Sequence, residues 1–273
     1  MKIAFQGIKG AYSESAVYRH FGNKAEAIGH ETFDDVFEAV KNGKADAGLV
    51  PVENTIAGSI ASNYDLLLKH DVYVTSEVFL SISHDLLANH GATLDGIKTV
   101  YSHPQAIEQC WSFIRKHGMK AAPEYDTAGA AKLVKERNRM DEAAIASGFC
   151  AGIYGLKILE ESIETNRNNT TKFFVFVNPD KVPKNTKAEK TSIAFKTKHY
   201  AGALINCLQR LAKHGINLTK LESRPIPENP WEYVFYADFE GGIEDETVKL
   251  ALSEMEAASL FLKVLGSYPK GKS

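Results

Sequence analysis

Short apolar runs alternate with helical patterns of hydrophobic residues along the chain as far as residue 177. We expect a strand at each apolar run and a helix where hydrophobic positions recur every three or four residues. Phe33–Lys41 has the helical spacing. Thr32 precedes it, with Asp35 three residues on, which predicts a capping box, and Gly43 predicts the end of the helix. This alternation is typical of an α/β domain. The expected strands are Lys2–Gln6, Ala45–Val50, Val72–Ile82, Thr99–Tyr101, Ala143–Ala146 and Lys172–Val177.

The pattern changes abruptly at residues 178–190, where two prolines and mostly charged or amide side chains leave little to bury. We therefore expect a domain over residues 1–177, a linker over 178–190 and a second domain over 191–273. The second domain reads as βαββαβ, the ferredoxin-like order. Its expected elements are Thr191–Lys196, Ala201–His214, Ile216–Leu221, Trp231–Phe239, Thr247–Leu260 and Leu262–Tyr268.

Charge and composition exclude several classes of partner. The 32 basic side chains do not outnumber the 34 acidic ones, so nucleic acid is not an expected partner. No apolar run approaches the roughly 20 residues that span a bilayer, and the chain opens on a strand-like run rather than a signal peptide. The widely spaced Cys110, Cys150 and Cys207 predict reduced thiols in the cytoplasm, without a disulfide or metal framework.

Polar residues gather where strands of the first domain should end, which is where open α/β sheets bind ligands. The glycines of Gly7–Glu14 differ from the dinucleotide motif, and turn formation alone would explain them. Pro51 is expected to end a strand just before Glu53, Asn54 and Thr55. These three residues would supply a carboxylate, an amide and a hydroxyl to a ligand, or only cap a turn.

Two further segments lie at entries to helices. Pro104 suits a first helical position and Gly118 an end, which predicts one helix over Pro104–His117 whose start, with Ser102, faces an anion. Gln105 and Gln109 would share one face of that helix, and His103 alone favours a capping role. The small residues of Asp126–Ala131 would also suit close packing alone. In Asn168–Phe173, which enters a strand, the local residues are ordinary turn material and do not by themselves make Thr171 an acid.

Together these segments resemble the prephenate dehydratase family in order and spacing. The family pattern consists of five motifs in a fixed order. They are Gly-x-x-Gly-Ala-Tyr-Ser, Pro-(Val/Ile)-Glu-Asn-(Ser/Thr), Ser-His-Pro-Gln, Thr-Ala and Asn-x-Thr-Arg-Phe. The corresponding segments here are, in the same order, Gly7–Ser13, Pro51–Thr55, Ser102–Gln105, Asp126–Ala131 and Asn169–Phe173. Lys172 replaces the family arginine, which keeps the charge but loses the bidentate fork. No chorismate-mutase-like segment precedes Met1, so we expect a monofunctional chain.

The resemblance implies a two-lobed catalytic domain, similar to periplasmic binding proteins, and a hydro-lyase that converts prephenate to phenylpyruvate in phenylalanine biosynthesis. Such a reaction needs no cofactor and no metal, because aromatisation drives it. The catalytic residues that it implies are Thr171, which donates or relays a proton, with Glu53, Asn54, Gln109 and Ser102. The substrate-binding residues that it implies are Thr55, His103, Asp126, Thr127, Ala128, Lys172 and Phe173.

The second domain resembles the family's ACT regulatory domain, through Gly202–Leu204, the Glu-Ser-Arg-Pro run Glu222–Pro225 and Leu265–Pro269. The resemblance implies allosteric regulation by L-phenylalanine and a homo-oligomer, a dimer or a dimer of dimers (a homotetramer). An exposed sheet edge also favours self-association. The implied phenylalanine-binding residues are Gly202, Ala203, Leu204, Asn217, Leu218, Glu222, Ser223, Arg224 and Pro225.

Two other functions stay open at this stage. A cytoplasmic ligand-binding sensor could share the two-lobed shape without any chemistry. Arogenate dehydratase performs the same reaction on the transaminated substrate, and the run Thr127–Ala131 resembles both groups.

Overall fold

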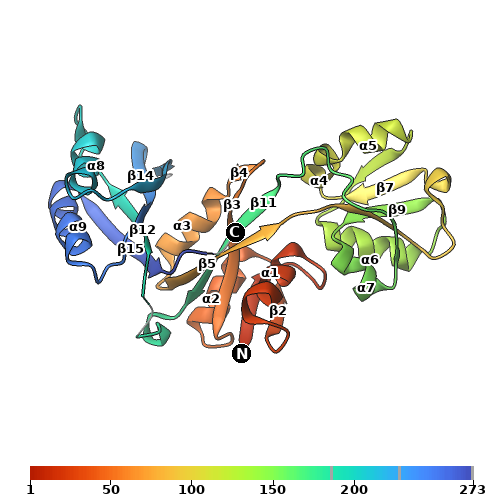
Figure 1. Cartoon of the computed structure of the whole chain (residues 1–273), viewed down its shortest axis with the longest axis horizontal. Helices are drawn as coiled ribbons and strands as arrows, with labels where there is room; N and C mark the ends of the chain where they lie inside the picture. Colours follow the sequence, from red (N-terminus) through yellow and green to blue (C-terminus); the bar gives the residue numbers. More distant parts are fainter. Residues whose placement is uncertain (185–186, 227–228, 272–273) are drawn as a thin grey trace. The chain divides into compact units, whose positions relative to one another are not determined.

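The computed structural model describes residues 1–184, 187–226 and 229–271, and its elements are labelled in Figure 1. The architecture is mixed α/β, with two compact units between which the chain passes several times. The first unit comprises residues 1–36, 49–59 and 79–173, and the second comprises 37–48, 60–78 and 174–273. Residues 185 and 186 of the expected linker lie outside the described residues. Among the described residues, no helix combines the length and apolar character needed to span a bilayer.

One sheet of the first unit contains β11 (Thr170–Val177, up to residue 173), β3 (Ala47–Asn54, from residue 49), β1 (Lys2–Gln6) and β2 (Glu26–His30), in that order. Helix α1 (Tyr12–Phe21) follows β1, and α2 (Phe33–Lys41) begins with the expected capping box. Asp35 N–H donates to Thr32 Oγ1 at 3.2 Å, and Thr32 N–H donates to Asp35 Oδ2 at 3.1 Å, which confirms it.

Pro51 does not end its strand, contrary to our expectation, because β3 continues to Asn54. Proline lacks only the N–H group, and its fixed φ is compatible with extended backbone. Beyond Pro51 the strand also gains a partner, since Glu53 and Asn54 pair with β4 (Gly58–Ser59).

The second sheet of this unit has the order β10-β6-β9-β7-β8. Strands β7, β8 and β9 are parallel, and helices cover both faces (Figure 1). Alternating strand residues divide between two cores, with Leu86 beneath α4 and α5 and Leu87 beneath α6 and α7. The carboxyl ends of β7, β8 and β9 therefore lead into helix starts at one edge. The bounds are β6 Asp85–Ala88, η1 Leu94–Gly96, β7 Thr99–Ser102, α4 Pro104–Gln109, α5 Trp111–Lys116, β8 Lys120–Pro123, α6 Thr127–Arg137, β9 Glu142–Ala146, α7 Gly148–Tyr154 and β10 Lys157–Glu160.

The single helix expected over Pro104–His117 is wrong, because α4 and α5 are separated at Cys110 (φ −100, ψ 11). The carbonyl of Gln109 accepts a hydrogen bond from Thr165 N–H at 2.9 Å. A partner from outside the helix competes for that carbonyl, and such insertions break helices.

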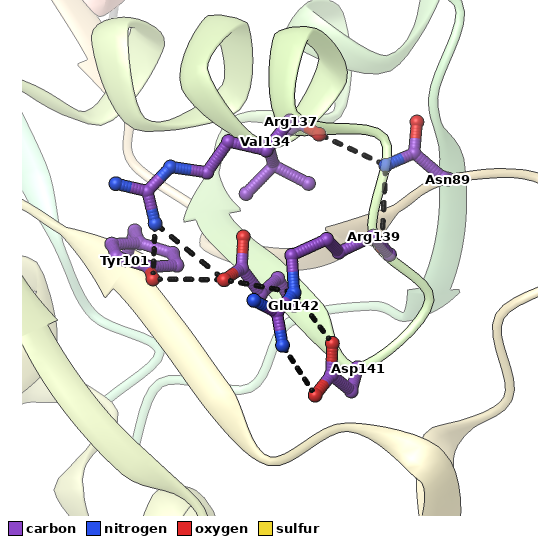
Figure 2. A network of polar contacts seen from close by, with 7 residues as sticks. All are labelled: Asn89, Tyr101, Val134, Arg137, Arg139, Asp141 and Glu142. Atoms are coloured by element: carbon purple, nitrogen blue, oxygen red, sulfur yellow. Dashed lines mark hydrogen bonds and ion pairs between the residues drawn. The ribbon is translucent and has the colours of Figure 1, made fainter.

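The opposite end of β9 carries an ionic network, which Figure 2 shows. Buried Glu142 accepts hydrogen bonds from Tyr101 Oη at 3.2 Å and from Arg137 Nη1 at 3.5 Å. Arg139 forms a bidentate pair with Asp141, with both distances 3.1 Å, and its Nε lies 3.5 Å from Glu142. These contacts hold together the residues at the start of β9, which is the end of the strand away from the helix starts.

The second unit contains the expected βαββαβ order, which is confirmed. Its strands lie in the order β13-β14-β12-β15, followed by β5. Helices α8 and α9 pack on one face over Ile193, Phe195 and Phe239. Lys263 donates to three carbonyls at the end of α3, those of Leu67, Leu68 and His70. The bounds are α3 Ala61–Lys69, β5 Tyr73–Ser81, η2 Pro179–Lys181, β12 Lys190–Lys196, α8 Ala203–Lys213, β13 Leu218–Ile226, β14 Asn229–Glu240, α9 Glu246–Ala258 and β15 Phe261–Tyr268.

Candidate functional site

Three segments that are far apart in the sequence meet in the first unit: the end of β3, the start of β11 and the end of α4. The side-chain amide of Asn54 donates to Thr171 Oγ1 at 2.9 Å and to Asn169 Oδ1 at 2.7 Å. Asn169 in turn donates to Gln109 Oε1 at 2.9 Å. The structure thus brings together three of the five residues expected to be catalytic.

Two residues that the sequence analysis did not select extend this arrangement. His84 Nε2 lies 2.8 Å from Gln109 Oε1, and His84 Nδ1 lies 2.8 Å from the Tyr12 hydroxyl. Tyr12 also donates to the Ser83 carbonyl at 2.5 Å. We call the whole arrangement the polar chain, formed by Tyr12, His84, Gln109, Asn169, Asn54 and Thr171.

The backbone holds the polar chain in place. Ile82 N–H donates to the carbonyl of Asn169 at 2.8 Å, and Ile163 N–H donates to that of His84 at 2.8 Å. His84 N–H donates to the buried carboxylate of Glu164 at 2.9 Å. Thr171, His84 and Asn169 are all buried, and Asn169 is only 1% exposed. Polar groups this deeply buried are held in one arrangement, because each lost bond leaves an unsatisfied group.

Electrostatics keep the polar chain uncharged near neutral pH. Burial lowers the pKa of His84, against the smaller opposing effects of its Gln109 hydrogen bond and of the Glu164 and Asp85 carboxylates. Burial also raises the pKa of Tyr12, so its phenol keeps its proton. The site therefore presents oriented neutral dipoles, which act strongly where water is excluded.

The glycine motif after β1 packs against α7. Cys150 Sγ donates to the Gly10 carbonyl at 3.2 Å, and Tyr154 Oη donates to the Lys9 carbonyl at 2.6 Å. A Cβ on Gly10 would lie 2.7 Å from Cys150 Sγ, and its φ of +94° also favours glycine. Burial raises the pKa of Cys150 to about 11, so it is a protonated thiol at neutral pH.

Several expected site residues have local structural contacts instead. Ser102 is fully buried and donates to the Ile145 carbonyl at 2.6 Å. His103 caps α4, with Nδ1 accepting Gln105 N–H at 3.3 Å, and Asp126 caps α6, with Oδ1 accepting Gly129 N–H at 2.5 Å. The polar chain includes none of these side chains.

The remaining expected site residues lie near the polar chain or in the core. Thr55 is exposed and donates to the Asn168 carbonyl at 2.9 Å. Glu53 is the neighbour of Asn54 in β3, so its side chain points to the opposite face of the strand. Lys172 is 8% exposed and, as the neighbour of Thr171, also leaves the other face of its strand. Phe173 and Ala128 are buried, and Thr127 begins α6.

The expected regulatory residues divide between two places in the second unit. Gly202, Ala203 and Leu204 line a cavity at the start of α8, together with Tyr200 and Phe235. The expected strand residues are not among its lining. Three of them contact charged side chains: Arg224 contacts Asp65 at 2.8 Å, Glu222 contacts Lys220 at 3.0 Å, and Asn217 contacts Glu240 at 3.3 Å. The other three, Leu218, Ser223 and Pro225, lie on β13.

Comparison with known proteins identifies the family. The family model for prephenate dehydratase matches residues 3–181. The chain belongs to the prephenate dehydratase family. Prephenate dehydratase is a hydro-lyase, so the chain belongs to a family of carbon–oxygen lyases.

Individual relatives agree with this assignment. The Arabidopsis thaliana protein named arogenate dehydratase/prephenate dehydratase 2, chloroplastic, is 42% identical over 278 residues, which cover 98% of this chain and 73% of the relative. A prephenate dehydratase from Arthrobacter aurescens, solved in complex with L-Phe, is 29% identical with a TM-score of 0.90, covering 98% of this chain and 90% of that one. A structure described as a novel type of quorum quenching acylase, GqqA, is 32% identical with a TM-score of 0.91, covering 99% and 98%.

Proposed function

We propose that the chain converts prephenate to phenylpyruvate, with Thr171 donating the proton to the departing hydroxyl. The observation that carries this proposal is the 2.9 Å bond from the Asn54 amide to Thr171 Oγ1. An amide N–H can only donate, so this bond uses a lone pair of the threonine oxygen. The hydroxyl proton of Thr171 is then left to be donated elsewhere, and the accepted bond makes that hydroxyl a better donor.

Two bonds of the substrate break in the proposed step. The ring C–O bond breaks, and the hydroxyl leaves as water with the proton of Thr171. The ring C–carboxylate bond also breaks, and its electron pair completes the aromatic ring as carbon dioxide leaves. Thr171 then recovers a proton from solvent, so each turnover consumes one proton. Since aromatisation supplies the driving force, the protein needs mainly to orient the substrate and assist departure.

The other expected site residues enter the proposal as substrate-orienting groups. Asn54 and Gln109 would polarise the departing groups through the polar chain. The backbone N–H groups at the start of α6 would hold a carboxylate, because helix starts favour anions. Glu53, Ser102, Thr55, His103, Asp126, Thr127, Ala128, Lys172 and Phe173 are proposed to shape or charge the surroundings of the substrate.

Arogenate is a second candidate substrate, because the Arabidopsis relative is named for both arogenate and prephenate. The test is turnover of prephenate and of arogenate by the same preparation. We expect the larger kcat/KM with prephenate. A larger value with arogenate would transfer the proposal to that substrate, and turnover of neither would defeat it.

Hydrolysis of N-acyl amides should be measured with the same preparation, since GqqA is described as an acylase. Cys150 lies close to the Ser147 hydroxyl, but its raised pKa keeps it protonated and unsuited to nucleophilic attack. We therefore expect no hydrolysis of N-acyl amides. Such hydrolysis that survives in a Thr171→Ala protein would indicate a second activity.

We also propose that residues 1–177 form the catalytic domain, 178–190 a linker and 191–273 an ACT domain that binds L-phenylalanine in a homodimer or a dimer of dimers. The βαββαβ order from Lys190 onwards supports this division. The separation of the expected regulatory residues into two places suggests that a second chain completes the site. A cytoplasmic location belongs to the same proposal, and the three buried free cysteines suit it.

A further inference from the structure

We propose that His84 is a positioning residue for this reaction, which holds Thr171 in its reactive orientation through Gln109, Asn169 and Asn54. The inference rests on the proposed function and adds to it the direction of every hydrogen bond between His84 and Thr171. That direction follows from the backbone next to Asn54.

The orientation of the Asn54 amide is set by two backbone donors. Ile56 N–H and Ala57 N–H both donate to Asn54 Oδ1, at 3.0 and 2.9 Å. A flipped amide would turn its NH₂ group towards these two N–H groups and lose both bonds. The NH₂ group of Asn54 therefore faces Thr171 Oγ1 and Asn169 Oδ1, at 2.9 and 2.7 Å.

The same orientation passes along the next two amides. Because Oδ1 of Asn169 accepts from Asn54, its NH₂ group must face Gln109, to which it donates at 2.9 Å. Gln109 consequently presents Oε1, an atom that can only accept. His84 Nε2, 2.8 Å from that oxygen, must carry a hydrogen.

The surroundings of the other ring nitrogen, Nδ1, agree with this tautomer of His84. With the hydrogen on Nε2, a neutral imidazole has its lone pair on Nδ1, which lies 2.8 Å from the Tyr12 hydroxyl. The single Tyr12 proton then lies between two acceptors, the Ser83 carbonyl at 2.5 Å and Nδ1, in a three-centre hydrogen bond. The ionisable groups near His84 are Glu164, Asp85 and Tyr12, and burial lowers the pKa of His84, which keeps the ring neutral at pH 7.5.

Loss of the Nε2 donor would remove the hydrogen bond between His84 and the side chain of Gln109. Its oxygen would be left with the Asn169 amide alone, and the buried polar chain would rearrange to satisfy the freed groups. A displacement of about 1 Å at a reacting group can lower a rate by about 100-fold. His84 would thus affect kcat although it does not touch Thr171.

Two substitutions separate this role from simple packing. In His84→Gln, the amide nitrogen falls near the position of Nε2 and keeps a donor for Gln109. In His84→Asn, the shorter amide reaches only the position of Nδ1, and the donor to Gln109 is lost. We expect kcat for prephenate to fall about 10–100-fold in His84→Asn and to stay much closer to wild type in His84→Gln, with KM and Tm similar in the two. Equal losses of kcat in both variants would overturn the proposal.

A spectroscopic measurement on the wild type tests the tautomer of His84 directly. The ¹⁵N shifts and couplings of histidine side chains at pH 7.5 distinguish the two neutral tautomers, and the His84→Gln spectrum assigns the signal. Hydrogen on Nε2 supports the proposal, whereas hydrogen on Nδ1 alone overturns it. If wild type turns over neither prephenate nor arogenate, the proposed function fails, and the tautomer still tests the orientation of the polar chain.

Discussion

At the scale of single residues, the acid proposed here depends on its neighbours. A threonine hydroxyl is a poor proton donor in water, and Thr171 differs from an ordinary one in being buried and in accepting a bond from Asn54. Low local dielectric strengthens such bonds, and fixed donors need no reorganisation during the reaction. The chemistry therefore belongs to an arrangement of amides rather than to one reactive side chain.

Thr171→Ala removes the proposed proton donor and should lower kcat by about 10²–10⁴-fold, since that is the usual contribution of a positioned acid. KM should change far less. Steady-state kinetics with prephenate measure both quantities. Thr99→Ala, at the start of β7, is the matched control and should keep wild-type kcat. Near-normal kcat in a folded Thr171→Ala protein would remove Thr171 from the mechanism.

Lys172 gives a second residue-level prediction. If its ammonium neutralises a substrate carboxylate as a point charge, Lys172→Met should raise KM markedly, while Lys172→Arg should be tolerated. The side chain is buried and leaves the strand face opposite Thr171, so a packing role would produce a different pattern. An unchanged KM with a lowered Tm in Lys172→Met would assign Lys172 to stability alone.

At the scale of elements, the two ends of β9 differ in what they carry. Its carboxyl end leads through Ser147 into α7, where the glycine loop packs. Its start carries Glu142, which holds Tyr101 of β7 and Arg137 of α6 together (Figure 2). Ligand chemistry in open α/β sheets concentrates at the carboxyl ends. The network of Figure 2 should therefore matter for stability and not for catalysis.

Glu142→Gln should lower the free energy of unfolding by about 1.5–3 kcal/mol, because it weakens buried hydrogen bonds to a charged group. Asp141→Asn is the matched control. Its bidentate pair with Arg139 is exposed and screened by solvent, so the loss should be clearly smaller than in Glu142→Gln. Urea unfolding measures both losses, and kcat should be unchanged in each variant. A lower kcat in folded Glu142→Gln would show that the network reaches the site.

At the scale of the whole molecule, the chain order does not coincide with the compact units. Strand β15 pairs in parallel with β5, and a Cβ on Gly266 would lie 2.3 Å from the Val74 carbonyl. Asp65 on α3 binds both Arg224 and Tyr236 from the strands of the same sheet. Removing the C-terminal strands would expose β5 and α3, so point substitutions test regulation better than truncation.

Phenylalanine should shift the prephenate saturation curve to higher substrate concentrations and make it sigmoidal, with a coupling of about 1–3 kcal/mol. Leu204→Ala, in the cavity at the start of α8, should weaken this response. Leu250→Ala, exposed on α9, should leave it intact. The measurements are prephenate kinetics with added phenylalanine and calorimetry of phenylalanine binding. No binding by the intact protein would leave the C-terminal elements as an association module.

The sequence by itself determined the family, the α/β character of the first part and the βαββαβ order of the second, because periodicity and motifs are local. It also selected Asn54, Gln109 and Thr171 through their motifs. It missed β2, β4, β6, β8 and β10, which are two to five residues long, and a run that short carries a weak signal.

Only the tertiary structure decided which polar residues meet. Asn54 and Thr171 are 117 positions apart, and no local pattern connects His84 with Gln109. The break at Cys110 likewise has no local signal, since it accompanies a hydrogen bond from Thr165. Ser102 and Asp126, selected for a ligand, were found in backbone contacts. A hydroxyl or carboxylate can satisfy either the backbone or a substrate, and only the three-dimensional arrangement of its neighbours decides which.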